Sequence, residues 1–181
     1  MQIAGKQLES RARAQQALDR LHGGRSKFPP FPRLEQSLLG VVYAASYAIG
    51  DYAAAEAAAR RQMPILKQLG GADAGGGAAR YIGSVVGAAQ AAARQGRQME
   101  AREMLKPALE YYRQERMAKS EDLEMRVYKC DALLAAALAD PAMRKAYLTE
   151  AAGLFDKMPA EAQRWRSYAV VRDERAHEMA R

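Results

Sequence analysis

Apolar residues recur along most of this chain at the three- to four-residue spacing of amphipathic helices, and turn signals interrupt the pattern at intervals. No stretch shows the sustained alternation of β-branched and polar residues that is typical of strands. The first periodic segment ends at Gly23-Gly24, a pair that favours a helix C-terminus. The pattern predicts an all-α protein of about eight antiparallel helices, at residues 2–22, 34–50, 51–69, 78–95, 97–118, 120–139, 141–158 and 160–181.

Prolines and acidic residues refine the ends of these predicted helices. Pro64 and Pro107 lie inside helical patterns, and because their neighbours keep helical spacing we expect each to kink its helix rather than end it. Ser120 is a favourable N-cap residue, followed by Asp122 in the first turn. Pro141 suits the first turn of the next helix.

Tight turns recur with a nearly constant period of about 45 residues, at Gly50-Asp51, Gly96-Arg97 and Asp140-Pro141. A period of this size indicates stacked two-helix repeats. One period before Gly50 the chain has Gly5, so residues 1–22 match the second half of a repeat whose first half is missing. We therefore expect the chain to be a piece of a longer protein.

Two short motifs resemble the tetratricopeptide repeat. Leu-Gly-x-x-Tyr at Leu39–Tyr43 is followed by Gly-Asp-Tyr-x-x-Ala at Gly50–Ala55, although the second motif comes one helical turn later than in that family. The resemblance covers about residues 34–159. It implies a single domain, a short right-handed α-solenoid of TPR-like long repeats. Its parts would be a half repeat at 1–22, a Pro-rich linker at 23–33, helical hairpins at 34–69, 78–118 and 120–158, and a capping helix at 160–181.

The same resemblance implies that the first helix of each pair lines a concave groove that binds a peptide or protein segment. Gln90 and Arg94 on helix 78–95 are candidate groove residues, as are Arg126 and Lys129 on helix 120–139. The alternative is that these four are solvated surface residues. The implied function is that of a non-enzymatic protein–protein interaction module, the C-terminal regulatory or scaffold part of a larger protein.

Three aromatic residues are candidates for self-association or docking. Phe28 and Phe31 lie in the Pro-rich segment, which reads either as a stiff loop covering the end of the core or as a docking segment for a neighbouring chain. Trp165 lies in the predicted capping helix, where it either packs at the end of the stack or anchors a homodimer contact. Tyrosines such as Tyr43 and Tyr47, by contrast, are expected to take part in core packing and hairpin contacts.

The net charge of +7 and the pI of about 9.6 introduce a second candidate function. A basic face can attract nucleic acid, and tyrosines can stack on bases. However, the polar groove positions do not repeat from one hairpin to the next, so a base-by-base code is not expected. Nucleic-acid binding is therefore kept as the alternative, through Arg80, Arg94, Arg97, Arg102, Arg113, Arg116, Tyr81, Tyr111 and Tyr112.

Signals for catalysis are missing from the sequence. His22 and His177 have no second histidine or cysteine at metal-ligand spacing, and no phosphate-binding loop, dinucleotide fingerprint or nucleophile elbow occurs. Cys130 falls in an apolar row and is expected to be a small core residue. We expect no enzyme activity and no cofactor. Without a long apolar run no membrane insertion is expected, and a cytoplasmic location is favoured unless the chain belongs to a larger extracytoplasmic protein.

Overall fold

The computed structural model describes residues 2–23, 31–70, 76–114 and 122–159, and these residues form seven α-helices and no strand. The all-α prediction is confirmed for this part of the chain. The predicted helix at 160–181, together with Phe28, Ser120 and Trp165, lies outside the described residues. The helices are α1 (Gln2–His22), α2 (Pro32–Ala48), α3 (Tyr52–Gln68), α4 (Gly76–Arg94), α5 (Gln98–Arg113), α7 (Leu123–Ala139) and α8 (Arg144–Phe155).

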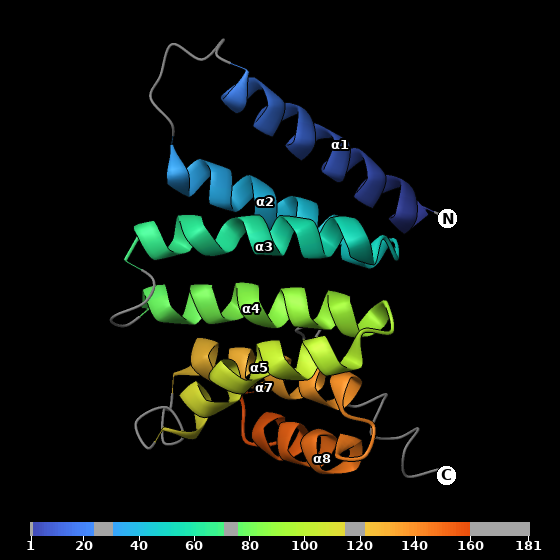
Figure 1. Cartoon of the computed structure of the whole chain (residues 1–181), viewed down its shortest axis with the longest axis vertical. Coiled ribbons are helices and arrows are strands. Elements are labelled where there is room, and N and C mark those ends of the chain that lie inside the picture. Colours follow the sequence, from blue (N-terminus) through green and yellow to red (C-terminus); the bar gives the residue numbers. More distant parts are fainter. Residues whose placement is uncertain (1, 24–30, 71–75, 115–121, 160–181) are drawn as a thin grey trace.

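The helices are stacked along the long axis of the molecule, from α1 at one end to α8 at the other, with α5 and α7 side by side at the same level (Figure 1). α1 packs against α2, α2 against α3, and α3 against α4. α4 also contacts α5 and α7, and α7 contacts α5 and α8. Because consecutive helices run antiparallel, α2, α4 and α7 point in the same direction (Figure 1). α4 is covered on several sides, which explains why so many of its alanines are fully buried.

The turns after α2 and α4 have the same structure. Gly50 and Gly96 adopt left-handed conformations, with φ of 83° and 81°. In both turns the N–H groups of the glycine and of the next residue, Asp51 or Arg97, donate to carbonyls in the last turn of the preceding helix at 2.9 to 3.2 Å. A residue with a Cβ atom would be strained here by about 1–2 kcal/mol. These glycines therefore fix the direction in which α3 and α5 leave the turn.

An ion pair joins each of these two turns to the helix that precedes its own hairpin. A third ion pair does the same for the turn before α8. The pairs are Arg11–Asp51 at 2.6 Å, Glu56–Arg97, and Arg102–Asp140 at 3.1 Å. The helix residues 11, 56 and 102 are 45 and 46 residues apart, which matches the period of the turns. The middle pair has the opposite polarity, so a shift by one hairpin would place Arg11 beside Arg97 and Glu56 beside Asp140. We call these three pairs the turn ladder.

Neither internal proline ends its helix. Pro64 lies within α3 and Pro107 within α5, and both helices continue beyond the proline. The helices are retained because their packing faces continue past the prolines, through Leu66 in α3 and Tyr112 in α5, both buried.

Four predicted helix ends were wrong: the C-terminus of α5, the N-terminus of α7 and both ends of α8. α5 ends at Arg113 rather than near 118, since Gln114 has extended backbone angles (φ −56°, ψ 138°) and no buried residue follows Tyr112 before the described segment ends. α7 begins at Leu123 rather than Ser120. The carboxylate of Asp122 accepts a hydrogen bond from the N–H of Met125 at 3.3 Å, so Asp122 caps this helix instead of lying in its first turn.

α8 is also shorter than the predicted 141–158. Residues 141–143 form a turn, in which the N–H of Met143 donates to the carbonyl of Asp140 at 3.1 Å, and the regular helix spans Arg144–Phe155. Pro141 therefore precedes the helix instead of opening its first turn.

Cys130 is a core residue, as predicted. Its side chain is fully buried in the cluster between α7 and α8, where its Sγ lies 3.8 Å from the carbonyl oxygen of Ala151. Burial raises the pKa of the thiol above its usual value, so Cys130 stays protonated at neutral pH.

Candidate functional site

A groove of about 550 Å³ lies between α2, α4 and α7, within the size range of ligand-binding sites. These are the helices predicted at 34–50, 78–95 and 120–139, so the structure brings the first helices of the three predicted hairpins together around one groove. α2 and α4 provide most of the lining, and α3 provides Ala59 and Gln62. The contribution of α7 is Tyr128, Asp131, Leu134 and Leu138.

Gln90 connects all three helices across the groove. The hydroxyl of Tyr43 on α2 donates to its Oε1 at 3.2 Å, and its Nε2 donates to the backbone carbonyl of Asp131 on α7 at 3.4 Å. The predicted groove residue Gln90 therefore does line the groove, but its amide is used on both sides to set the spacing of the helices.

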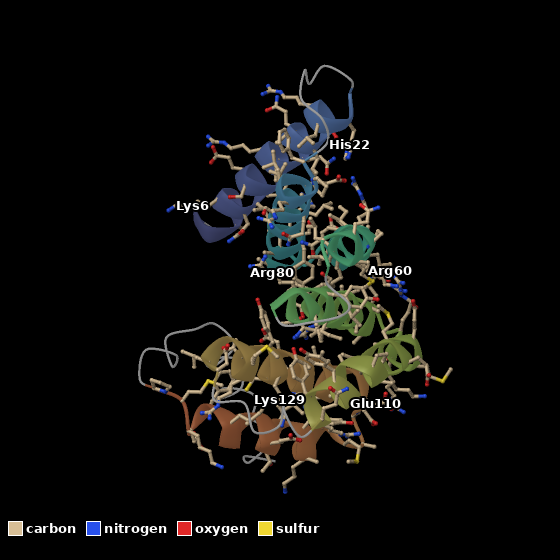
Figure 2. The ribbon with its side chains drawn as sticks, turned by 90° about the vertical axis from the view of Figure 1, so that its left-hand side faces the viewer. Lys6, His22, Arg60, Arg80, Glu110 and Lys129 are labelled. Carbon is tan, nitrogen blue, oxygen red and sulfur yellow. The ribbon has the colours of Figure 1, made fainter. Side chains whose placement is uncertain are left out.

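Arg94, the second predicted groove residue on α4, is exposed at the C-terminal end of the lining. Its Nε donates to the hydroxyl of Tyr47 at 3.4 Å. Arg80 lies at the other end of α4 and also lines the groove, on the opposite side of the stack from Arg60 (Figure 2). The lining thus has a cationic side chain near each end of α4.

The glycine at position 87 lets an aromatic side chain lie directly on α4. A Cβ atom built at Gly87 would come within 2.9 Å of Cζ of Tyr43, closer than real Cβ atoms approach other atoms. Tyr43 in turn contacts the ring of Tyr47 at a centroid distance of 5.9 Å, and Tyr47 contacts Tyr52 of α3 at 5.3 Å. The tyrosines make the expected hairpin contacts, and two of them also line the groove, which the sequence interpretation missed. The signal was their i, i+4 spacing on α2.

Arg126 and Lys129 are not among the lining residues. Lys129 instead forms an ion pair with Glu150 of α8, with 3.0 Å between Nζ and Oε1. The reason is the rotation of α7, which turns Tyr128 and Asp131 toward the groove and the neighbouring face toward α8. The sequence placed these residues on the correct helix but on the wrong face of it.

Phe31 is the only one of the three aromatic docking candidates that lies within the described residues. It is 47% exposed and precedes α2, where its carbonyl accepts the N–H of Glu35 at 3.0 Å. Self-association through Phe31, Phe28 or Trp165 stays a prediction.

The arginines of the nucleic-acid alternative are distributed over separate surfaces. Arg80 and Arg94 line the groove, whereas Arg97 and Arg102 belong to the turn ladder. Arg113 lines a second cavity of about 240 Å³ between α5, α7 and α8, and Arg116 lies outside the described residues. Of the tyrosines, Tyr112 is buried and Tyr81 lies under the ammonium group of Lys67, 5.5 Å from its ring centroid. No single basic stripe results from the described residues.

In the part of the chain that the structure describes, no three histidine, cysteine or acidic side chains are grouped so that they could hold a metal ion. Of the helices described, none has the length and apolar character needed to span a bilayer.

No protein-family model, no curated protein and no solved structure matches this chain.

Proposed function

We propose that this chain is a non-enzymatic protein-interaction module, a short right-handed α-solenoid of TPR-like hairpins that binds a peptide or protein segment between α2, α4 and α7. The observation that carries this proposal is the groove itself, which is lined by the first helix of each of three successive hairpins. The direct links from Tyr43 to Gln90 and from Gln90 to α7 hold these helices at fixed distances. A ligand would therefore meet a preformed surface, which lowers the entropic cost of binding.

The repeated geometry of the hairpins supports the solenoid part of the proposal. The turns at Gly50 and Gly96 share one conformation, and the turn ladder joins equivalent positions of successive hairpins. A stack in which each unit contacts mainly its neighbours is the defining property of solenoid proteins.

The chemistry of the lining supports a peptide or protein segment as the ligand. Tyrosine rings and the apolar side chains of Leu134 and Leu138 provide contact area, while Gln36 and the tyrosine hydroxyl groups can pair with peptide amides. Aromatic side chains with a polar group are enriched where proteins bind one another.

Filling the groove tests the proposal. Ala44 is exposed and lines the groove, whereas Ala48, one turn further along α2, is exposed outside the lining. Peptides that bind the full wild-type chain would be selected from a random phage-displayed library. Their affinities for Ala44→Trp and Ala48→Trp would then be compared with their affinity for the wild type. We expect Ala44→Trp to weaken binding by about tenfold or more, since the indole occupies the ligand's space, and Ala48→Trp to have little effect. Equal binding by both variants, at equal melting temperature, would refute the groove as the binding site.

A further inference from the structure

The charges of the groove form a simple pattern. Among its lining residues only Arg80, Arg94 and Asp131 are charged, and all the others are neutral. The two arginines lie on α4, with exposed side chains, and Asp131 lies on α7, half-buried. The lining thus has a net positive charge that is concentrated at two separate positions.

The spacing of the two arginines sets a length for the ligand. Arg80 and Arg94 are fourteen residues apart on one helix, which is nearly four turns, so both lie on the same face about 21 Å apart along the axis. An extended peptide rises about 3.3 Å per residue, so about six residues span this distance. A helix would need about fourteen residues to span the same distance, since it rises only about 1.5 Å per residue. Helices of that length are marginal on their own in water, so a segment that binds in extended form avoids the cost of forming one.

Asp131 adds a restriction to the part of the ligand between the two arginines. Its backbone carbonyl accepts the hydrogen bond from Gln90, which lies one turn before Arg94 on α4, so Asp131 lies between the arginines and nearer to Arg94. An acidic residue facing this position would meet a like charge, whereas a neutral or amide side chain would not.

We propose that the groove binds an extended protein segment with two acidic residues about six positions apart, one carboxylate at Arg80 and the other at Arg94, and no acidic residue between them. This inference rests on the proposed function and specifies its ligand. Arginine suits the role because its planar guanidinium can donate two parallel hydrogen bonds to one carboxylate.

The test selects peptides from a random phage-displayed decapeptide library, separately on the wild-type chain and on three charge-reversal variants. Arg80→Glu and Arg94→Glu alter the groove. Arg113→Glu is the matched control, since Arg113, like Arg94, is an exposed arginine in the last turn of its helix but lies outside the groove. Arg113→Glu therefore places an unfavourable negative charge at a helix C-terminus, as Arg94→Glu does. Melting temperatures from circular dichroism would establish that all variants are folded.

We expect the wild-type chain and Arg113→Glu to enrich peptides with two Asp or Glu residues five to seven positions apart. Arg80→Glu and Arg94→Glu should each bind those peptides about tenfold more weakly and should select lysine or arginine in place of one acidic residue. Enrichment of peptides without the acidic pair, or of acidic pairs at every spacing, would overturn the inference. Such peptides would still support the proposed function if Ala44→Trp weakens their binding. Peptides that bind Ala44→Trp normally, or the absence of any enriched peptide, would overturn both.

Discussion

At the scale of single residues, the shape of the groove depends on how closely side chains of α2 approach the backbone of α4. Tyr43 lies against Gly87 and reaches Gln90 one turn further along. Gly83, one turn before, faces a wider space, since a Cβ atom there would be 3.9 Å from Cε1 of Tyr128. These two glycines of α4 therefore differ in how much space a side chain would have at their positions.

Replacing each glycine by alanine tests this difference in available space. Alanine is favoured over glycine in a helix by about 1 kcal/mol, and Gly83→Ala makes only an ordinary contact, so we expect its free energy of unfolding to rise by about 0.5–1 kcal/mol. Gly87→Ala must displace Tyr43, which costs its hydrogen bond to Gln90, worth about 1 kcal/mol, and the ring packing. We expect no net gain or a loss for Gly87→Ala. Urea unfolding followed by circular dichroism measures both, and an equal rise for the two variants would contradict the close approach of Tyr43.

Which residues line the groove was only partly predictable from the sequence. Gln90 and Arg94 were identified because the spacing along α4 was read correctly. Arg126 and Lys129 were misplaced because the rotation of α7 depends on its contacts with α5 and α8 as well as with α4. Periodicity shows that a helix has an apolar face but not which neighbour covers each part of it.

At the scale of helices and turns, the turn ladder fixes how one hairpin follows another. Its central residue, Glu56, is 7% exposed and accepts hydrogen bonds from Arg60 at 2.8 Å, from Gln95 at 2.9 Å and from Arg97. Burial by itself would raise the pKa of Glu56, but the hydrogen bonds from Arg97, Arg60 and Gln95 outweigh burial and hold the pKa below its usual value of 4.5.

Removing the charge of Glu56 should destabilise the stack. Glu56→Gln removes the buried carboxylate that both arginines share and leaves Glu100 as their remaining acidic partner, so we expect a loss of about 1–3 kcal/mol in the free energy of unfolding. Glu103→Gln is the control, since Glu103 is 69% exposed and pairs with Lys106 within α5, where a change of at most about 0.5 kcal/mol is expected. Equal losses in the two variants would argue against a special role for the turn ladder.

Wild type and Glu56→Gln should also differ in how their stability depends on pH. Because the pKa of Glu56 is lowered by folding, its ionised form stabilises the folded state at pH values above 4.5, and this stabilisation disappears as the pH falls through the folded-state pKa. Wild-type stability should therefore decrease more steeply below pH 4.5 than that of Glu56→Gln. Parallel pH profiles for the two proteins would show that Glu56 does not titrate with folding.

The positions of the helices could be predicted well from the amino-acid pattern, but several of their ends could not. Periodicity and glycine turns located α1 to α4 to within about two residues. The ends of α5 and α8 depend on where packing against neighbours stops, and this is a tertiary property. The turn ladder was missed because its partners are about 40 residues apart in the sequence, although its helix positions recur with the period of the turns.

At the scale of the whole molecule, the successive hairpins place three parallel helices around one groove, and the turn ladder lies at the ends where the hairpins turn. The turn-ladder residues are thus separate from those proposed to meet a ligand. Variants of the groove, such as Ala44→Trp, can therefore change binding without breaking the turn ladder.

Backbone NMR of the isotopically labelled full chain, titrated with a peptide selected from the library, would map the surface that the peptide contacts. We expect the largest changes in amide chemical shift along the groove, at Ala44, Gly87 and Asp131, with small changes on the outer face of α8. Changes that cluster instead around Arg113 and Tyr147, which line the second cavity, or on α1 would contradict the assignment of the groove as the binding surface.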